Sequence, residues 1–176
     1  SGETISLSTG VHVGGVLTQR EGVTIQGPRE AVVCGPSGDR AIEIRHNSIV
    51  LRGFTIQRAD NGVWMAGVSE CLLEDLLIRN MDGEGVRIKN QSHRNTVRKC
   101  VFERMGRTGF DLSEDHKNGE GVYIGTAPEQ RKKNSPPDVP DRCTGNIVED
   151  CRFDTEAAEA VAIKEDRTGN IVRRCE

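Results

Sequence analysis

The segment Glu84-Gly85-Val86-Arg87-Ile88 recurs as Glu120-Gly121-Val122-Tyr123-Ile124 and as Glu159-Ala160-Val161-Ala162-Ile163. Two earlier segments, Ala41-Ile42-Glu43-Ile44 and Gly62-Val63-Trp64-Met65, have the same alternation of apolar and variable residues. The five copies begin at residues 41, 62, 85, 121 and 160, so their spacings are 21, 23, 36 and 39 residues. A basic period near 22 residues, with every second side chain apolar, is typical of strands stacked in a solenoid.

A second repeat has the pattern apolar-x-x-apolar-x-apolar, and its copies begin at Leu51, Leu73, Val97, Val148 and Val172. Just before the last three copies stand Asn95, Asn146 and Asn170, whose amides can stack along the axis at a tight corner. No segment has the apolar spacing of a helix, and the consensus of a leucine-rich repeat is missing. Two repeats in one phase therefore predict an all-β, single-stranded, right-handed parallel β-helix of about six coils.

The chain is expected to form one domain over residues 1–176, interrupted by two inserted loops at about 108–118 and 126–142. The second loop carries four of the six prolines together with Arg131, Lys132 and Lys133. Both loops flank the copy that contains Tyr123, and long loops on a rigid scaffold usually bind ligands. Because the chain stops at Glu176 within a repeat, we expect it to be part of a longer protein, or to self-associate or meet further domains through uncapped coil ends.

Composition excludes several function classes. The net charge is −3 and aromatic residues make up 3% of the chain, which argues against a nucleic-acid partner. No apolar run is long enough to span a membrane. Cys100, Cys151 and Cys175 fall in one inward column and are expected to be buried thiols. Possible pairing of Cys34, Cys71 and Cys143 stays open, because connectivity cannot be deduced from sequence.

Side chains between the apolar positions should point outward from the coils. One outward column contains Trp64, Arg87 and Tyr123, and the next contains Lys89 and Lys164. Exposed aromatic rings among cations suit a sugar that carries a carboxylate or a sulfate. We therefore expect a solvent-facing stripe that binds substrate through Trp64 and Lys89, helped by Arg131 and Lys132 of the second loop. The alternative is an ordinary solvated strand face with incidental aromatic residues.

The glutamates that precede three of the copies would form a column with a spacing of about 4.8 Å between neighbours. Carboxylates that close raise one another's pKa unless a cation lies between them. Calcium would suit Glu84, Glu120 and Glu159 with the amide of Asn118, since it prefers oxygen ligands. The column could equally be neutralised by Arg87, Lys117 or Lys164 as an ion-pair ladder. Both interpretations stay open.

The opening Gly2-Glu3-Thr4-Ile5-Ser6-Leu7, followed by Gly10-Val11-His12-Val13-Gly14, resembles the first coil of pectate-lyase-like β-helix proteins. The segment Glu159–Lys164 followed by Asn170 is similar to a segment of the alginate lyase and chondroitinase B family of polysaccharide lyases. This resemblance implies that Glu159 binds calcium, that Lys164 is the Brønsted base, and that Asn118 or Glu120 completes the metal site.

The chain also departs from that family's pattern. Ala157 stands where the family has a second acidic ligand, and Glu165 stands where it has a serine. The family's catalytic arginine would fall beyond Glu176. The resemblance therefore covers the fold of nearly the whole chain and only part of the catalytic set.

The residue types fit β-elimination on a uronic-acid polysaccharide by a secreted enzyme. Calcium or Arg87 would neutralise the carboxylate, Lys164 would remove the C5 proton, and Tyr123 would protonate the leaving oxygen. One alternative is a glycoside hydrolase, because glutamates on adjacent coils approach the roughly 5 Å separation of retaining enzymes. The other is a non-catalytic carbohydrate-binding or structural module.

Overall fold

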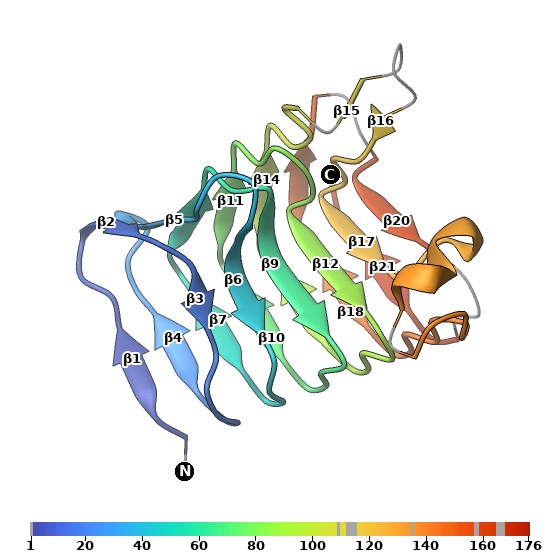
Figure 1. The fold of residues 1–176 in the computed structure, drawn as a ribbon. Helices are drawn as coiled ribbons and strands as arrows, with labels where there is room; N and C mark the ends of the chain where they lie inside the picture. The colour runs from blue at the N-terminus through green and yellow to red at the C-terminus, as the bar shows by residue number, and fades with distance from the viewer. Residues whose placement is uncertain (1, 109, 112–115, 135, 157–158, 165–167) are drawn as a thin grey trace.

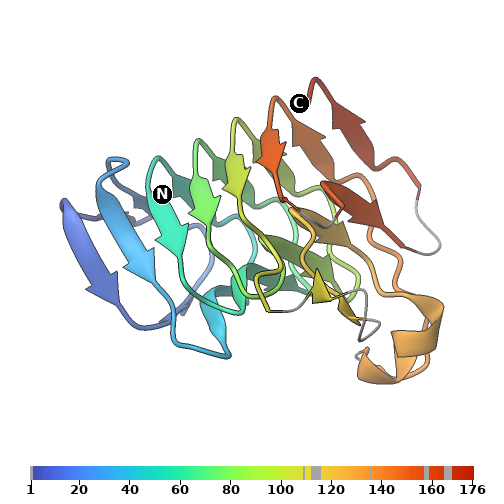
Figure 2. The ribbon, with the colours of Figure 1, turned by 90° about the horizontal axis from the view of Figure 1, so that it is seen from above.

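The computed structural model describes residues 2–108, 110–111, 116–134, 136–156, 159–164 and 168–176. The chain winds into a solenoid whose coils each contribute one strand to three parallel sheets (Figures 1 and 2). The sheets contain seven, six and six strands, and within each sheet every strand pairs with the equivalent strand of the next coil. The predicted all-β parallel helix of about six coils is therefore confirmed.

The strands are short, and we name the sheets A, B and C in the order in which the chain visits them. Sheet A contains β1 (Thr4–Ser6), β4 (Thr24–Gln26), β7 (Val50–Arg52), β10 (Leu72–Glu74), β13 (Thr96–Arg98), β18 (Ile147–Glu149) and β21 (Ile171–Arg173). Sheet B contains β2 (Gly10–Val13), β5 (Ala31–Cys34), β8 (Thr55–Gln57), β11 (Leu77–Arg79), β14 (Val101–Glu103) and β19 (Arg152–Asp154). Sheet C contains β3 (Val16–Leu17), β6 (Arg40–Ile44), β9 (Asn61–Ala66), β12 (Val86–Lys89), β17 (Val122–Ile124) and β20 (Val161–Ile163).

The register of sheet C matches the five sequence copies. Val63, Val86, Val122 and Val161 lie opposite one another on successive strands. Arg87 is likewise paired with Trp64 on one side and with Tyr123 on the other. Since the valines point into the core, these paired residues point away from it. The predicted phase of the repeat is confirmed.

The corner before sheet A is held by a buried amide ladder. The side-chain nitrogen of Asn95 donates to Oδ1 of Asn146 at 3.0 Å, and that of Asn146 donates to Oδ1 of Asn170 at 3.1 Å. The Asn95 and Asn146 backbone nitrogens donate to the same oxygens at 3.0 and 2.8 Å. Each oxygen thus accepts two hydrogen bonds, and the predicted stacking of amides is confirmed.

The core is a column of aliphatic, aromatic and thiol side chains. The rings of Phe102 and Phe153 stack with centroids 4.7 Å apart and planes inclined by 8°. All six cysteines are free thiols. Cys100 and Cys151 are buried as predicted, whereas Cys175 is half-buried because it lies in the last coil.

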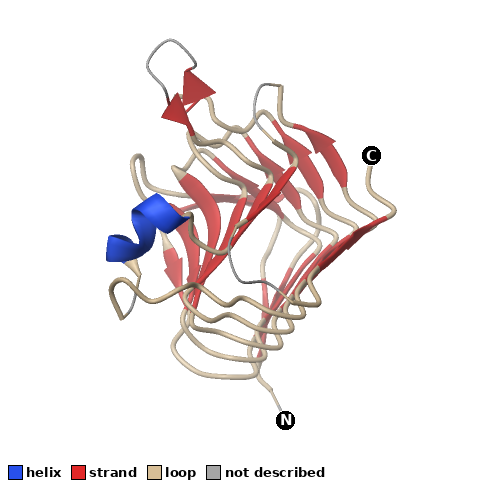
Figure 3. Ribbon diagram, turned by 90° about the vertical axis from the view of Figure 1, so that its right-hand side faces the viewer, coloured by secondary structure: helices blue, strands red, loops and turns tan. Residues whose placement is uncertain are grey.

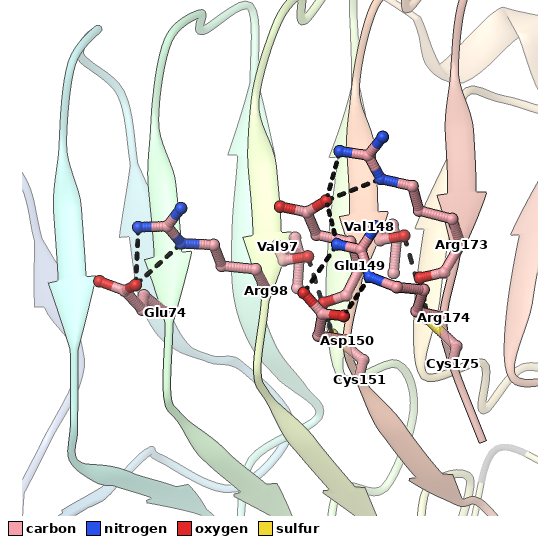
Figure 4. Close-up of polar contacts among 10 residues, drawn as sticks. All are labelled: Glu74, Val97, Arg98, Val148, Glu149, Asp150, Cys151, Arg173, Arg174 and Cys175. Carbon is pink, nitrogen blue, oxygen red and sulfur yellow. Dashed lines mark hydrogen bonds and ion pairs between the residues drawn. The ribbon is translucent and has the colours of Figure 1, made fainter.

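The outer face of sheet A carries a ladder of charges. Glu74 bridges Arg52 and Arg98 at 2.7 Å each. Figure 4 shows the pair of Glu74 with Arg98 and the pair of Glu149 with Arg173, which is also 2.7 Å long. The carboxylate of Asp150 holds Arg174 on the adjoining turn at 2.6 Å. Isolated surface ion pairs contribute little, but a network in which one carboxylate serves two arginines costs less side-chain entropy per pair. The third position of the sheet A strands from β7 onward therefore helps to fix the register.

Both predicted insertions flank β17. The first forms an antiparallel pair of short strands, β15 (Phe110–Asp111) and β16 (His116–Lys117), which projects from the solenoid (Figure 1). The second contains a 3-10 helix, η2 (Pro128–Lys133), which lies beside sheet C (Figure 3). No helix in the described part of the chain is long and apolar enough to cross a membrane.

Glycine at the entry to β9, β12 and β17 is required by close packing between coils. A Cβ on Gly121 would lie 2.5 Å from a ring carbon of Phe153 and 2.7 Å from the carbonyl oxygen of Ala160. We expect Gly121→Ala to lower the free energy of unfolding by about 2 kcal/mol through overpacking. Urea denaturation measures the loss. Gly15→Ala is the control, because its added Cβ would meet nothing closer than 3.4 Å; equal stability of the two variants would contradict the packing argument.

Candidate functional site

A cavity of about 370 Å³ lies on the outer side of sheet C, over β6, β9 and β12. The strands supply its floor, and η2 of the second insertion supplies part of its wall. The lining side chains that matter for its chemistry are Asp39, Arg40, Asp60, Asn61, Trp64, Glu84, Arg87, Lys89, Asn118, Gln130 and Lys133. The repeat thus brings residues of three coils to one site.

Cations and aromatic rings alternate along this face. The guanidinium carbon of Arg40 lies 4.0 Å from the Trp64 ring centroid, and that of Arg87 lies 3.8 Å from the Tyr123 centroid. Arg87 is also 6.0 Å from Trp64, and Lys164 Nζ is 5.7 Å from Tyr123. Each cation faces the electron-rich side of a ring, which favours a fixed arrangement of the stack.

The prediction of a solvent-facing stripe is wrong for three of its members. Arg87, Lys89 and Tyr123 point away from the core but are only 5–6% exposed. The stacked neighbours cover Arg87 and Tyr123, and the second insertion reaches Lys89, whose Nζ donates to the carbonyl oxygen of Lys133 at 3.5 Å. Trp64 and Lys164 remain half-buried.

The glutamate column is split between buried and exposed members. Glu84 accepts a hydrogen bond from Arg87 Nη1 at 2.5 Å and another from the Asn61 amide at 3.3 Å. Glu120 is buried and accepts from the Gly119 backbone nitrogen at 3.0 Å. Glu159 is exposed and lies 4.0 Å from Lys164 Nζ. Among the described side chains, which do not include that of Lys117, ion pairs neutralise Glu84 and Glu159.

Burial dominates the electrostatics of Glu84. Desolvation raises the pKa of the Glu84 carboxyl above its usual value, the charge of Arg87 opposes this rise, and Glu120 and Asp60 add to it. The short hydrogen bond from Arg87 favours the ionised carboxylate and so offsets part of the cost of burying it.

At Glu84, the guanidinium of Arg87 and the amide of Asn61 each donate to one carboxylate oxygen, so a calcium ion there would compete with both bonds; Glu84 as a calcium ligand stays a prediction. Asn118 lines the cavity wall and is exposed. Within the described ranges, no group of three or more histidine, cysteine, aspartate or glutamate side chains is placed to hold a metal ion. A calcium ion at Glu120, Glu159 and Asn118 stays a prediction.

The cavity is polarised along the strands. Asp39 and Asp60 stand immediately before β6 and β9, at one end, whereas Lys89 ends β12 and meets Lys133 at the other. Arg131 and Lys132 belong to the same insertion, half-buried and exposed respectively, and neither lines the cavity. The insertion instead contributes Gln130 and Lys133.

Two titratable groups at opposite ends have shifted pKa values. Burial, and then the charges of Asp82 and Asp39, raise the pKa of Asp60, while Arg40 opposes the rise. Burial, and then the charge of Arg87, lower the pKa of Lys89, against the opposing charges of Asp141 and Glu84.

Sequence analysis missed the acidic end of the cavity. The available signal was an aspartate two residues before the copies that begin at Ala41 and Gly62, which places Asp39 and Asp60 on adjacent coils. It also missed Gln130 and Lys133 as lining residues, because the path of an insertion does not follow from the repeat. Glu114 and Asp115 of the first insertion lie outside the described residues. At Asp111 and His116 of the same insertion, the structure describes the backbone only.

Among solved structures, the chain is similar to an alginate lyase from Paenibacillus sp. str. FPU-7, with a TM-score of 0.85 and 22% identity over 98% of this chain and 58% of that one. It is also similar to a putative glycosyl hydrolase from Parabacteroides merdae ATCC 43184, with a TM-score of 0.71 and 16% identity over 99% of this chain and 80% of that one. At these identities the likeness is one of fold. The chain spans less than two thirds of the length of that alginate lyase.

No curated protein matches the chain significantly. Residues 6–176, however, match the family model described as "Right handed beta helix region". The match covers nearly the whole chain and includes every coil of the three sheets. It agrees with the handedness that the repeat predicted, so the chain belongs to the right-handed β-helix family.

Proposed function

We propose that this protein binds an acidic polysaccharide in the cavity over sheet C and cleaves it by β-elimination. The observation that carries the proposal is the polarised cavity, in which Lys89 and Lys133 lie at the end opposite Asp39 and Asp60, and Arg87 lies on the same strand as Lys89. A uronic acid offers a carboxylate to the cationic end and hydroxyl groups to the acidic end. The similarity in fold to an alginate lyase supports this choice of substrate class.

The proposed reaction uses Arg87, which lines the cavity, together with Tyr123 and Lys164 of the two following coils, which do not line it but continue the same stack of side chains. Arg87, whose Nη1 is bound to Glu84, adds positive charge beside the substrate carboxylate through the rest of its guanidinium, which makes the C5 proton more acidic. Lys164 takes that proton, the C4–O bond breaks as the C4=C5 double bond forms, and Tyr123 donates its hydroxyl proton to the leaving oxygen. Burial raises the pKa of Tyr123 to about 12, so its hydroxyl is protonated at neutral pH. Calcium at Glu120, Glu159 and Asn118 would supply further neutralising charge.

The test is a direct assay on alginate, pectate and dermatan sulfate, read by the ultraviolet absorbance of the unsaturated product. We expect one of these polymers to give a steady gain in absorbance and Lys164→Gln to slow it about a hundredfold, as expected for loss of a general base. Lys99→Gln is the matched control, since Lys99 lies on a turn between sheets A and B. Flat traces on all three polymers would reject the elimination.

A glycoside hydrolase is the second candidate, and Asp60 is the observation that favours it. Asp60 lines the cavity with a raised pKa, which is the property of a general acid. The glutamates expected for this role are less suitable, because Glu84 is bound to Arg87 and both Glu84 and Glu120 are buried. New reducing ends without a gain in ultraviolet absorbance would favour hydrolysis over elimination.

Binding without either product would leave a non-catalytic module. In all three cases the ligand is a polysaccharide of the kind found outside cells, so we propose that the protein is secreted.

A further inference from the structure

The cationic end of the cavity has a more specific role, and its argument rests on the proposed function. We infer that Lys89 is the residue that binds a sugar carboxylate, with Arg87 and Lys133 supplying the surrounding positive charge. Lys89 thereby determines that an acidic rather than a neutral sugar occupies this part of the cavity.

Lys89 is a buried charge that has no counter-ion among the described residues. Its side chain lines the cavity, yet the residue is only 5% exposed. An ammonium group has three donors, and the one hydrogen bond that Nζ makes to a described residue is the long contact of 3.5 Å to Lys133 O. In the described part of the chain, no carboxylate forms an ion pair with it. A buried charge is costly unless it is paired, so the site is complementary to an anion.

The neighbouring charges reinforce this imbalance. Arg87 forms an ion pair with Glu84 through Nη1, while its buried Nε has no hydrogen-bond partner among the described residues. Lys133 extends the positive surface up the wall formed by η2. Asp141 is near enough to act on Lys89, but its oxygens accept from the backbone nitrogens of Asn90 and Gln91 and from Thr126. None of these groups replaces an anion at Lys89.

Trp64 argues for an anion that is carried on a sugar. Its ring lines the same cavity, with its centroid 5.5 Å from Lys89 Nζ. Arg40 already stacks on this ring at 4.0 Å, but Trp64 is only half-buried. The part of the ring that lines the cavity provides apolar area, against which one pyranose can lie while its carboxylate meets Lys89. The acidic residues Asp39 and Asp60 at the far end would repel the same carboxylate and so fix the orientation of the ring.

The experiment is calorimetric titration of the whole chain with a short oligouronate, with the carboxyl-reduced oligosaccharide, and with acetate and sulfate alone. We expect the oligouronate to bind, and Lys89→Met to weaken its binding about tenfold to a hundredfold, as for loss of a hydrogen bond to a charged group. The carboxyl-reduced sugar should bind weakly and equally to both proteins. Lys99→Met is the matched control, and the urea midpoint of each variant checks that it is folded.

The pH dependence gives a readout that a structural role of Lys89 would not give. Because burial and the charge of Arg87 lower its pKa, Lys89 loses its proton at a lower pH than an ordinary lysine. Affinity for the oligouronate should therefore fall as the pH rises through this lowered pKa. Lys89→Arg, which keeps its charge, should retain binding and flatten the fall. The other charged groups that act on the Lys89 ammonium are the same in Lys89→Arg; they are Lys133, Glu84 and Asp141.

The outcomes separate this inference from the proposed function. Binding that depends on Lys89 without any turnover would support the carboxylate site and reject the lyase. Turnover with equal oligouronate affinity in Lys89→Met would reject the carboxylate site and leave the lyase. The site is also rejected if the wild type does not bind the oligouronate, if the carboxyl-reduced sugar suffers the same loss, or if acetate or sulfate alone binds as tightly as the sugar.

Discussion

Arg87→Met is expected to lower the free energy of unfolding by about 3–5 kcal/mol, the usual cost of removing one partner of a buried ion pair. Glu84 is 5% exposed, and without Arg87 its carboxylate would keep only the Asn61 amide at 3.3 Å. Methionine fills much of the same space, so the loss reports charge more than volume. Urea denaturation at neutral pH, followed by circular dichroism, measures it.

The control for this prediction is the double variant Glu84→Gln, Arg87→Met. The neutral amide introduced by Glu84→Gln removes the carboxylate charge that Arg87→Met leaves buried without its partner. The double variant should therefore be more stable than Arg87→Met alone, which gives strong non-additivity in the double-mutant cycle. Two additive losses would show that the pair does not act as a unit.

The pH dependence of Arg87→Met has a defined sign. The pKa of Glu84 in the folded protein is raised, so the stability linked to its proton is fully present below its unfolded pKa and is lost as pH rises through the folded value. Removing Arg87 raises that folded pKa further, because Arg87 is the group that lowers it. The deficit of the variant should therefore be large at neutral pH and shrink in acid.

The fold could be predicted from sequence because the same physical requirement recurs in every coil. One position of every sheet C strand must fill the core at the same depth, as Val86, Val122 and Val161 do. The corner before sheet A must have its backbone hydrogen bonds satisfied in each coil, and the amides of Asn95, Asn146 and Asn170 satisfy them. Repetition makes such requirements visible without a structure. The charge ladder of sheet A was readable in the same way, from the alternating signs of Arg52, Glu74, Arg98, Glu149 and Arg173 at equivalent positions.

The candidate site was only partly predictable, because alternation tells which way a side chain points and not what covers it. Arg87 and Tyr123 were correctly placed outside the core, but their stacking against each other makes them buried. Lys89 is buried by an insertion whose path depends on contacts across some fifty residues of sequence, such as Gln91 to Asp141. Those contacts have no period, so no repeat analysis can reveal them.

Asp141 is the residue that anchors this insertion, and Asp141→Asn is expected to destabilise the protein by about 3 kcal/mol. The carboxylate is 1% exposed and accepts hydrogen bonds from the backbone nitrogens of Asn90 and Gln91 at 2.9 and 3.0 Å and from Thr126 Oγ1 at 2.8 Å. An asparagine has one acceptor oxygen, so its amide nitrogen would face donors that it cannot satisfy. Urea denaturation gives the loss, with Asp138→Asn, an exposed aspartate of the same insertion, as the control.

The same substitution should change acid sensitivity and ligand binding. Burial alone would raise the pKa of Asp141, but the hydrogen bonds from Gln91, Asn90, Thr126 and Cys143 hold it below its usual value. Its contribution is therefore present above the unfolded pKa and lost as pH falls through the folded one, and Asp141→Asn should lack this part of the acid dependence. Because η2 carries Lys133 to Lys89, oligouronate affinity should fall as well. Unchanged affinity in a folded Asp141→Asn protein would mean that the insertion does not build the cationic end of the cavity.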